Sequence, residues 1–387
     1  MSSAEPASTT PERLRVAICI TGLSVGGAET FLAELLKHVP DDVEMRVFSL
    51  IDGGPIAKRI EVLGIPVTGM HMLAGRPSLY AMLSLTSQLR AYRPTIVHTW
   101  MYHADFMGGI AAKLAGVPHV IWHLHNSDLS PQRVRRMTRW VVKALAVLSR
   151  WIPDAILSCS EAAVRAHTAV GYAAEKFTVI PNGVDTERFL PSTQARAAIR
   201  EEFGFGDRSP VIGLVARVDA QKNHRGFFQA VKAFFERGGD ADFLLVGRDV
   251  TPDHWQLSKL VGRTGHQSRV VLAGPRDDIP RVMAALDVAT SSSLGEAFPL
   301  VLIEAMSCGT PCVATDVGDS ALIVGDTGII VAPDDADALA AAWVRLLAMA
   351  QEERAELGRR ARDRVLANYS IEQISARVWE LYWTVAG

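Results

Sequence analysis

The sequence predicts an α/β protein of two doubly wound domains that face each other across a central cleft. The chain has 387 residues, too many for one ordinary hydrophobic core. Short β-rich runs alternate with helical stretches along its whole length, six runs in each half, and this alternation favours parallel sheets covered by helices. Between the two sets, Pro, Asn and Gly cluster in the segment that begins at Pro181, which indicates a junction between domains.

The expected strands follow one another along the chain. They are the runs 15–20, 45–51, 95–100, 119–124, 154–160 and 176–181 in the first half, and 211–216, 243–247, 269–274, 287–293, 311–315 and 328–332 in the second. The last helix, from 370 to about 386, carries an apolar stripe that includes Ile374, Val378 and Tyr382. We therefore divide the chain into a disordered tail at 1–12, an N-terminal domain at 13–188, a C-terminal domain at 189–369, and a helix at 370–387 that packs back on the N-terminal domain.

Composition and charge exclude several classes of protein. A net charge of −2 gives no global reason to expect a nucleic-acid partner. The four cysteines are too few for a disulfide framework, and we expect buried thiols in a reducing compartment. The first residues lack the basic and apolar regions of a signal peptide, and no uncharged apolar run reaches the length of a membrane span. We expect a cytoplasmic protein.

The loops that follow the strands are where a doubly wound fold binds its ligands. The first of them, TGLSVGGAETF, places Gly26 and Gly27 directly before an apolar helix. Glycines there let the backbone approach a ligand, and the free N–H groups of a helix start suit an anion. A simple strand-to-helix turn explains the pair equally well. The spacing is not the G-x-G-x-x-G fingerprint of dinucleotide binding.

Two cations follow the first strand of the second half, in the loop ARVDAQKNH. Arg217 and Lys222 lie five residues apart in this polar loop, just before an apolar helix. A guanidinium and an ammonium at the end of a strand can bind one dianionic group together. Two solvated surface charges are the alternative interpretation.

Two carboxylates flank a helix start in the segment GEAFPLVLIEAMSCG. Glu296 lies in the loop, and Glu304 follows about two helical turns later in an apolar run. The N–H groups near Phe298 and Leu300 are free for phosphate oxygens. Carboxylates accept hydrogen bonds from vicinal diols, and a lone glutamate in an apolar run is costly to bury. A structural ion pair for Glu304 and a helix-dipole partner for Glu296 are the plainer interpretations.

Positive groups for a diphosphate beside acceptors for sugar hydroxyls describe a nucleotide-sugar site, and the same segments resemble a known family. RVDAQKN is similar to the R-x4-K element of retaining GT-B-fold glycosyltransferases, glycosyltransferase family 4, and EAFPLVLIE is similar to its E-x7-E element. GGAE, PNGVDTERF and GPRDDIPRVMAALDVATSSS match further parts, and the likeness runs from about Arg13 to Trp383. It implies two Rossmann-like domains, an acceptor-side one followed by a nucleotide-sugar-binding one.

The resemblance also implies a role for each matching residue. Arg217 and Lys222 would neutralise the donor diphosphate. Glu296 would bind hydroxyls of the transferred sugar, and Glu304 would hold the ribose diol. The other implied contacts are those of Gly26 and Gly27 from the N-terminal domain, Arg276 on the nucleobase side, Phe298, Pro299 and Leu300 around the phosphates and sugar, and His125 at the sugar, with His123 on the same strand face as its alternative.

The implied activity is that of a hexosyltransferase that keeps the anomeric configuration. It would move a hexose-type sugar from a nucleoside diphosphate to a glycan, lipid-linked or small-molecule acceptor. We expect no metal and no other cofactor, because we see no D-x-D cluster of the kind that holds divalent ions in other glycosyltransferase folds, and fixed cations would stabilise the leaving group. His119, His123 and His125 alternate along one strand without a Cys or carboxylate at ligand spacing, so no zinc site is predicted. A double displacement with Glu296 as nucleophile stays open.

The acceptor side offers one further pattern, the stretch 133–151. It has six basic residues and no acid, with Trp140, Val141, Leu145 and Leu148 among them. This is typical of a basic amphipathic helix, which would give the protein a peripheral contact with anionic lipid on the inner face of the membrane. We favour the alternative, a helix packed on the sheet with a solvated basic face. The segment at the end of the expected strand 95–100 contains further candidates for lining an acceptor cleft, namely Trp100, Tyr102, His103 and Asp105.

Three rival functions are weighed against the glycosyltransferase. A nicotinamide-dependent dehydrogenase shares the doubly wound pattern but needs the glycine fingerprint that is missing here. A sugar-nucleotide epimerase of the same fold needs no separate acceptor. A non-catalytic nucleotide-sugar-binding protein binds the donor without transfer, although the complete set of Arg217, Lys222, Glu296 and Glu304 argues against it. The sequence names neither the sugar, the base nor the acceptor.

Overall fold

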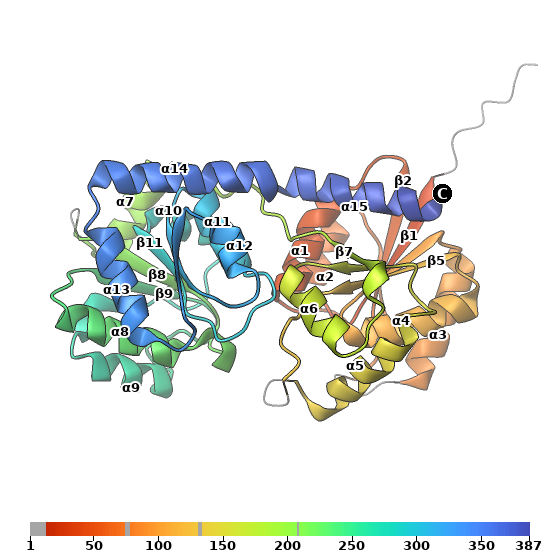
Figure 1. Ribbon diagram of the computed structural model, residues 1–387. Coiled ribbons are helices and arrows are strands. Elements are labelled where there is room, and N and C mark those ends of the chain that lie inside the picture. The colour runs from red at the N-terminus through yellow and green to blue at the C-terminus, as the bar shows by residue number, and fades with distance from the viewer. Residues whose placement is uncertain (1–12, 74–77, 131–133, 207–208) are drawn as a thin grey trace, which may run out of the picture.

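The computed structural model describes residues 13–73, 78–130, 134–206 and 209–387. Two parallel β-sheets, each covered by helices, lie side by side, and the C-terminal helices run along one side of both (Figure 1). We call the first sheet with its helices the N-terminal domain and the second sheet with its helices the C-terminal domain. The predicted α/β fold of two doubly wound domains is confirmed. The tail expected at 1–12 lies outside the described residues.

The first sheet has seven strands in the order β3-β2-β1-β4-β5-β6-β7, and every neighbouring pair is parallel. The strands are β1 Leu14–Ile20, β2 Val43–Ser49, β3 Val67–Gly69, β4 Ile96–Trp100, β5 His119–Leu124, β6 Ala155–Ser158 and β7 Phe177–Val179. The sequence predicts all of these except β3. That edge strand has three half-buried residues, too few to form the apolar run by which buried strands are recognised.

Each face of the first sheet carries its own hydrophobic core. Because successive strand residues point to opposite faces, Ala17 and Cys19 of β1 enter one core while Val16 and Ile18 enter the other. The first core is closed by α3 Leu79–Tyr92, α4 Tyr102–Ala115 and α5 Arg136–Leu148. The second contains residues of α1 Gly27–Leu35 and α2 Pro55–Val62. The remaining elements of this domain are η1 Leu36–His38, α6 Glu161–Ala169 and η2 Ala174–Lys176.

The second sheet has six strands in the order β10-β9-β8-β11-β12-β13, again parallel throughout. They are β8 Val211–Val215, β9 Asp242–Val246, β10 Val270–Leu272, β11 Val288–Ser291, β12 Cys312–Thr315 and β13 Gly328–Val331. One face packs against α8 His224–Glu236, α9 Trp255–Thr264 and α13 Ala336–Leu347. The other packs against α7 Thr193–Glu202, α10 Ile279–Ala285, α11 Leu300–Ser307, α12 Ser320–Val324 and α14 Gln351–Asn368. Two short 3-10 helices, η3 Ala220–Lys222 and η4 Gln267–Arg269, complete it.

The last helix, α15 Ile371–Ala386, lies against the N-terminal domain although it ends the chain (Figure 1). Ile374, Val378 and Tyr382 belong to the core that α1 and α2 cover. The Tyr382 hydroxyl lies 2.5 Å from Nδ1 of His98 on β4. A parallel bridge between Val184 and Ser370 joins the two chain segments that cross between the domains. The connection between the domains therefore consists of two adjacent segments of the chain, which contact each other at this bridge.

The strand order reverses once in each sheet, between β1 and β4 in the first and between β8 and β11 in the second. At such a point the loops that follow the two strands diverge to opposite faces and leave a crevice at the carboxyl edge of the sheet. The loops after β1, β4, β8 and β11 are therefore the expected walls of a ligand site. Among the described residues, no helix is both long and apolar enough to span a bilayer.

Candidate active site

A cavity of about 430 Å³ lies between the two domains, and loops of both contribute to its wall. Its lining comprises Gly27, Ala28, Met101, Tyr102, His125, Asn126, Cys159 and Asn182 from the N-terminal half, and Val215, Arg217, Gln221, Lys222, Glu296, Ala297, Phe298, Pro299, Leu300 and Val301 from the C-terminal half. The loops after β4, β8 and β11 contribute directly, and the segment after β1 contributes through the first residues of α1. The cavity thus brings together eight of the eleven predicted site residues.

Three helices begin at this cavity. The first residues of α1, α4 and α11 are Gly27, Tyr102 and Leu300, and all three line it. In the described part of the chain, the N–H groups of Leu300 and Val301 have no hydrogen-bond acceptor, and no side chain caps α11. Because a helix start carries partial positive charge and free N–H groups, the cavity is preorganised for an anion.

The start of α4 is set by a strained residue. Met101 precedes α4 with φ +73° and ψ 154°, a backbone conformation that residues other than glycine rarely adopt. Its N–H donates to the carbonyl of His123 at 3.2 Å, and its carbonyl accepts from the N–H of Asp105 at 2.9 Å. These two bonds hold the turn, which directs the first turn of α4 toward the cavity.

Lys222 and Glu296 form an ion pair within the wall of the cavity. Nζ of Lys222 donates to Oε1 of Glu296, and the hydroxyl of Ser293 donates to the same oxygen at 2.7 Å. The Lys222 and Glu296 side chains are 21% and 13% exposed, so both reach the cavity while remaining largely protected from water. The pair joins the loops that follow β8 and β11.

Arg217 is held by a carboxylate of its own loop. Its Nη2 and Nε lie 3.0 and 3.3 Å from Oδ2 of Asp219. The other oxygen, Oδ1, accepts from the N–H of Gln221 at 2.9 Å and caps η3, whose last residue is Lys222. Partial burial acts to raise the pKa of Asp219, but the hydrogen bonds from Gln221 and Arg217 lower it overall. Asp219 therefore stays ionised and orients the predicted diphosphate-binding groups.

His125 lies in the cavity wall at the end of β5, and its predicted alternative His123 does not. The two rings stand 4.0 Å apart between their centroids, and His125 stacks on Trp100 at 4.9 Å. Burial lowers the pKa of His125 to about 3, so its imidazole is neutral at physiological pH. His123 is wholly buried, with its ring stacked on that of His98 at a centroid distance of 5.2 Å.

Three predicted site residues lie outside the cavity wall. Arg276 binds Glu202 and Asp278 through its guanidinium, which lies 5.3 Å from the ring centroid of Phe203. Gly26 is the N-cap of α1, one residue before the wall, and a Cβ there would lie 2.4 Å from Oε2 of Glu29. Glu304 is the fifth residue of α11, just over one turn from the start of the helix.

Glu304 is half-buried, lies outside the cavity lining and is affected by the charges of two neighbouring groups. Burial is the main reason why the pKa of its carboxyl rises to about 7; nearby Glu34 adds to the rise and Arg188 opposes it. Glu34 belongs to α1, and Arg188 precedes the C-terminal domain, with its Nη1 3.9 Å from Oε1 of Glu34. Glu304 itself does not line the cavity.

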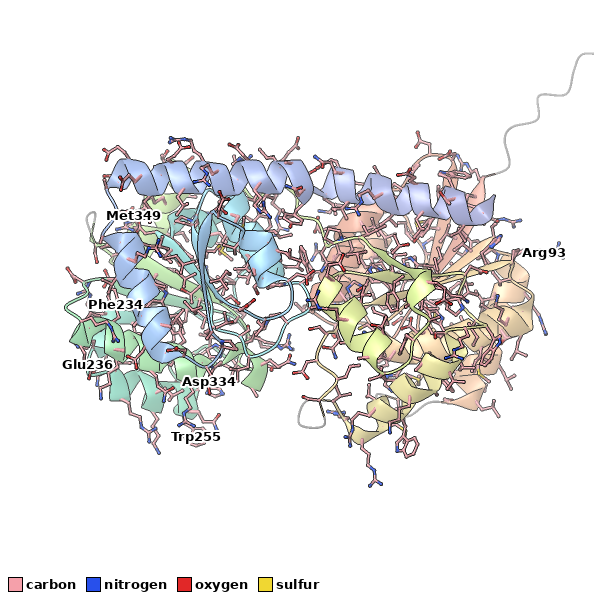
Figure 2. All side chains as sticks on the ribbon, viewed as in Figure 1. Arg93, Phe234, Glu236, Trp255, Asp334 and Met349 are labelled. Atoms are coloured by element: carbon pink, nitrogen blue, oxygen red, sulfur yellow. The ribbon has the colours of Figure 1, made fainter. Side chains whose placement is uncertain are left out.

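Sequence reasoning assigns no role to several residues of the wall. Asn182 belongs to the quoted PNG segment, is 4% exposed, and its Oδ1 has no hydrogen-bond partner. The sequence signal for it is an amide side chain at the domain junction. Of the residues proposed for an acceptor loop, Tyr102 lines the cavity, whereas Trp100 and Asp105 are wholly buried. A hollow of about 520 Å³ between α9 and the loop that follows β8 contains none of the predicted residues; its wall includes Trp255, which is labelled in Figure 2.

The sequence and the architecture both match known proteins. The family model for Glycosyltransferase Family 4 matches residues 25–188, and that for Glycosyl transferases group 1 matches residues 209–349. An alpha-D-kanosaminyltransferase of Streptomyces kanamyceticus is 30% identical over 322 residues, covering 75% of this chain and 79% of that protein. The UDP-Gal:alpha-D-GlcNAc-diphosphoundecaprenol alpha-1,3-galactosyltransferase of Escherichia coli is 28% identical over 278 residues, covering 69% and 70%. The structure of Anabaena Alr3699/HepE in complex with UDP-glucose superposes with a TM-score of 0.83 at 23% identity, covering 96% and 99%.

Two doubly wound domains with a ligand cavity between them form the GT-B fold, and the protein is a glycosyltransferase. The matches to both halves of the chain, and the relative that shares 30% identity over three quarters of it, define the family. The chain belongs to glycosyltransferase family 4. The family and the fold expected from the sequence motifs are thereby confirmed.

Proposed function

We propose that this enzyme transfers a hexose-type sugar from a nucleoside-diphosphate sugar to an acceptor hydroxyl, with retention of anomeric configuration and without a metal ion. One observation carries the proposal. Arg217, Lys222 and the uncapped start of α11 surround the same cavity as the carboxylate of Glu296. Fixed positive charge thus lies beside an acceptor for sugar hydroxyls, as a diphosphate leaving group and its sugar require.

The donor class rests on the site and on two relatives. The Anabaena structure contains UDP-glucose, and the E. coli relative is a UDP-galactose-dependent transferase by name. In the present cavity, Lys222 and the N–H groups of Leu300 and Val301 would bind the diphosphate, and Arg217 would approach it from the same loop. We assign the ribose diol to Glu304 and the nucleobase side to the loop of Arg276. The second assignment requires Arg276 to exchange Glu202 and Asp278 for the nucleotide.

The reaction follows from where charge develops. As the bond between the anomeric carbon and the phosphate oxygen breaks, negative charge grows on the diphosphate beside Lys222 and α11, and positive charge grows on the sugar ring. The acceptor hydroxyl attacks from the face that the leaving group vacates and gives its proton to the departing phosphate. Glu296 positions the sugar through its hydroxyls. Neutral His125, at the opposite wall, binds a sugar hydroxyl without repelling the positively charged ring.

We further propose that the acceptor reaches the enzyme at an anionic membrane on its cytoplasmic face. The inner side of α5 packs on the sheet through Val141, Val142 and Leu145. On its outer side Met137, Trp140 and Val147 recur at helical spacing, Trp151 lies in the turn that follows the helix, and all four are 54–67% exposed. The cations Arg135, Arg136, Lys143 and Arg150 are exposed beside them. A basic helix with an uncovered aromatic stripe suits the headgroup region of a bilayer; residue 133, where the predicted stretch begins, lies outside the described residues.

The decisive experiment combines binding and product analysis. Thermal-shift screening of the purified protein against a panel of nucleotide sugars should identify a donor, because a ligand of the native state raises the melting temperature. With that donor, NMR of the product should show the anomeric configuration of the donor, in the presence of a metal chelator as well as in its absence. An inverted product, or activity abolished by the chelator and restored by a divalent ion, would contradict the proposal. Isomerised donor without acceptor would indicate the epimerase instead.

A further inference from the structure

The carboxylate of Asp319 is shared between the two domains. Asp319 lies directly before α12 in the C-terminal domain and is 6% exposed. Its Oδ2 accepts a hydrogen bond from the N–H of Glu161 at 2.8 Å, and its Oδ1 accepts one from the N–H of Ala162 at 3.0 Å. These are the first two residues of α6 in the N-terminal domain. A carboxylate of one domain therefore caps a helix of the other.

The cap of α6 is complete only while the domains are together. A helix leaves its first N–H groups without acceptors inside the helix. The hydroxyl of Ser160 accepts from the N–H of Ala163 at 3.1 Å, so the N–H groups of Glu161 and Ala162 are left for Asp319. Separation of the domains would break two charge-assisted hydrogen bonds at the positive end of the helix dipole.

The same turn sets the backbone of the loop that carries Glu296. The N–H of Asp319 donates to the carbonyl of Ala297 at 3.0 Å. Gly318 has a φ of +59°, and a Cβ at this position would lie 2.4 Å from the carbonyl oxygen of Glu296. Glycine is therefore required for the turn to lie against this loop. From the opposite domain, the hydroxyl of Ser127 donates to the same carbonyl oxygen of Glu296.

We propose that Asp319 is a positioning residue that couples the approach of the two domains to the placement of Glu296. This inference rests on the proposed binding of the transferred sugar by Glu296. When α6 meets the carboxylate, the turn at Asp319 is fixed, and its N–H fixes Ala297 beside the sugar-binding carboxylate. Glu296 thus takes its working position at the moment when closure excludes water from the donor. Asp319 does not line the cavity and takes no part in bond making.

The contact can be removed from either domain. Asp319→Asn keeps the shape of the side chain and removes its charge. Glu161→Pro removes one of the donating N–H groups; proline suits the first position of a helix, and Ser160 before it, at φ −156° and ψ 151°, already has the extended conformation that proline requires. Glu161→Ala keeps the N–H and controls for the lost side chain. Asp316→Asn, at an exposed position three residues earlier, controls for the lost charge.

The catalytic measurement is the ratio of donor hydrolysis to sugar transfer by the full chain. Both Asp319→Asn and Glu161→Pro should raise this ratio about tenfold and lower kcat for transfer, because a charge-assisted hydrogen bond is lost in the closed state. Affinity for the free nucleoside diphosphate should stay within about twofold. The two control variants should match the wild type. An unchanged ratio in Asp319→Asn and Glu161→Pro would overturn the coupling.

A second measurement does not depend on catalysis. Dyes on Lys113→Cys in α4 and Glu236→Cys in α8 report the separation of the domains by energy transfer, since all four native cysteines are buried. Asp319→Asn and Glu161→Pro should both increase the open population of the ligand-free protein, and an unchanged separation in both would refute the coupling. If the wild type transfers no sugar to any acceptor, the proposed function fails, and this measurement still decides the inference. Should Asp319→Asn fail to fold, Glu161→Pro decides it.

Discussion

Lys222 donates a hydrogen bond from Nζ to Oε1 of Glu296, so the cation that we propose for the leaving group and the carboxylate that we propose for the sugar neutralise each other. The pair lies beside the start of α11, where the N–H groups of Leu300 and Val301 have no hydrogen-bond acceptor among the described residues. Donor binding must therefore divide the pair, with the ammonium turning to the diphosphate and the carboxylate to the sugar hydroxyls. Substituting each residue of the pair in turn tests this exchange of partners.

Lys222→Ala should weaken binding of the nucleoside diphosphate by about 2 kcal/mol, because a charge-assisted hydrogen bond to phosphate is lost. The parent nucleoside should bind with nearly unchanged affinity. Calorimetry with both ligands measures the difference. Lys232→Ala, which removes a cation of the outer surface of α8 paired with Glu236, serves as the control. An equal loss of affinity for nucleoside and diphosphate would remove Lys222 from the phosphate site.

Glu296→Gln should lower the rate of transfer by about a hundredfold, because the sugar loses an ionised acceptor in the transition state. Binding of the free nucleoside diphosphate should be unchanged or tighter, since Lys222 is released from its ion pair. Steady-state kinetics with calorimetry separates the two effects. Glu236→Gln on α8 is the matched control. Equal losses in transfer and in diphosphate binding would contradict the sugar-binding role.

The sequence predicts the fold and the family, and eight of its eleven predicted site residues line the cavity, because strand-end loops and helix starts follow from local patterns. It does not predict what a side chain touches across the tertiary structure. Arg276 matches a family element, yet Glu202 and Asp278 hold its guanidinium. The positive φ of Met101 has no local signal, since methionine is not expected there. The strand β3 is too short for a periodic pattern.

Glu304 should make the stability of the ligand-free protein depend on pH. Burial raises the pKa of its carboxyl from 4.5 to about 7, so the folded state binds more protons than the unfolded state between these values. The free energy of unfolding therefore falls as pH rises through this interval. Glu304→Gln removes the contribution of this carboxyl to the pH dependence of stability, and it should raise the melting temperature at pH 8 more than at pH 5. Calorimetric scans at both pH values measure it, and equal shifts would contradict the raised pKa.

The same group should control nucleotide affinity. A ribose diol donates its hydrogen bonds to an ionised carboxylate, so donor affinity should rise from pH 6 to pH 8 as Glu304 loses its proton. A nucleotide sugar is the proper ligand, because its phosphates are both esterified and do not titrate in this range. Glu304→Gln should bind more weakly and with no such dependence on pH. A slope that persists in Glu304→Gln would assign the titration to another group.

Met101 should be one of the few positions where glycine is more stable than alanine. Its φ of +73° costs a non-glycine residue about 1–3 kcal/mol, whereas glycine adopts it freely. Met101→Gly should therefore unfold at a higher denaturant concentration than Met101→Ala, and both lack the methionine side chain. The order should reverse at Leu83, an exposed residue in the interior of the helix α3, where glycine costs about 1 kcal/mol relative to alanine. Equal midpoints for the two Met101 variants would show that the turn carries no strain.

The outer side of α5 should bind anionic vesicles. Trp140 and Trp151 are 62% and 67% exposed there, and Nζ of Lys143 lies 5.6 Å from the ring centroid of Trp140. In flotation assays the protein should rise with vesicles rich in phosphatidylglycerol and stay behind with phosphatidylcholine alone, since anionic headgroups attract the cations.

The variant Arg136→Glu with Lys143→Glu should lose most of this binding, and Trp140→Ser with Trp151→Ser should lose the part that persists at high salt. The matched control is Lys259→Glu with Arg263→Glu on α9, a basic helix of the other domain that also exposes a tryptophan, Trp255 (Figure 2). Because α9 lies in the C-terminal domain and α5 in the N-terminal domain, reversal of these charges should leave flotation unchanged. Equal flotation by the α5 variants and the wild type would contradict the proposed membrane contact. The acceptor would then be sought among soluble sugars.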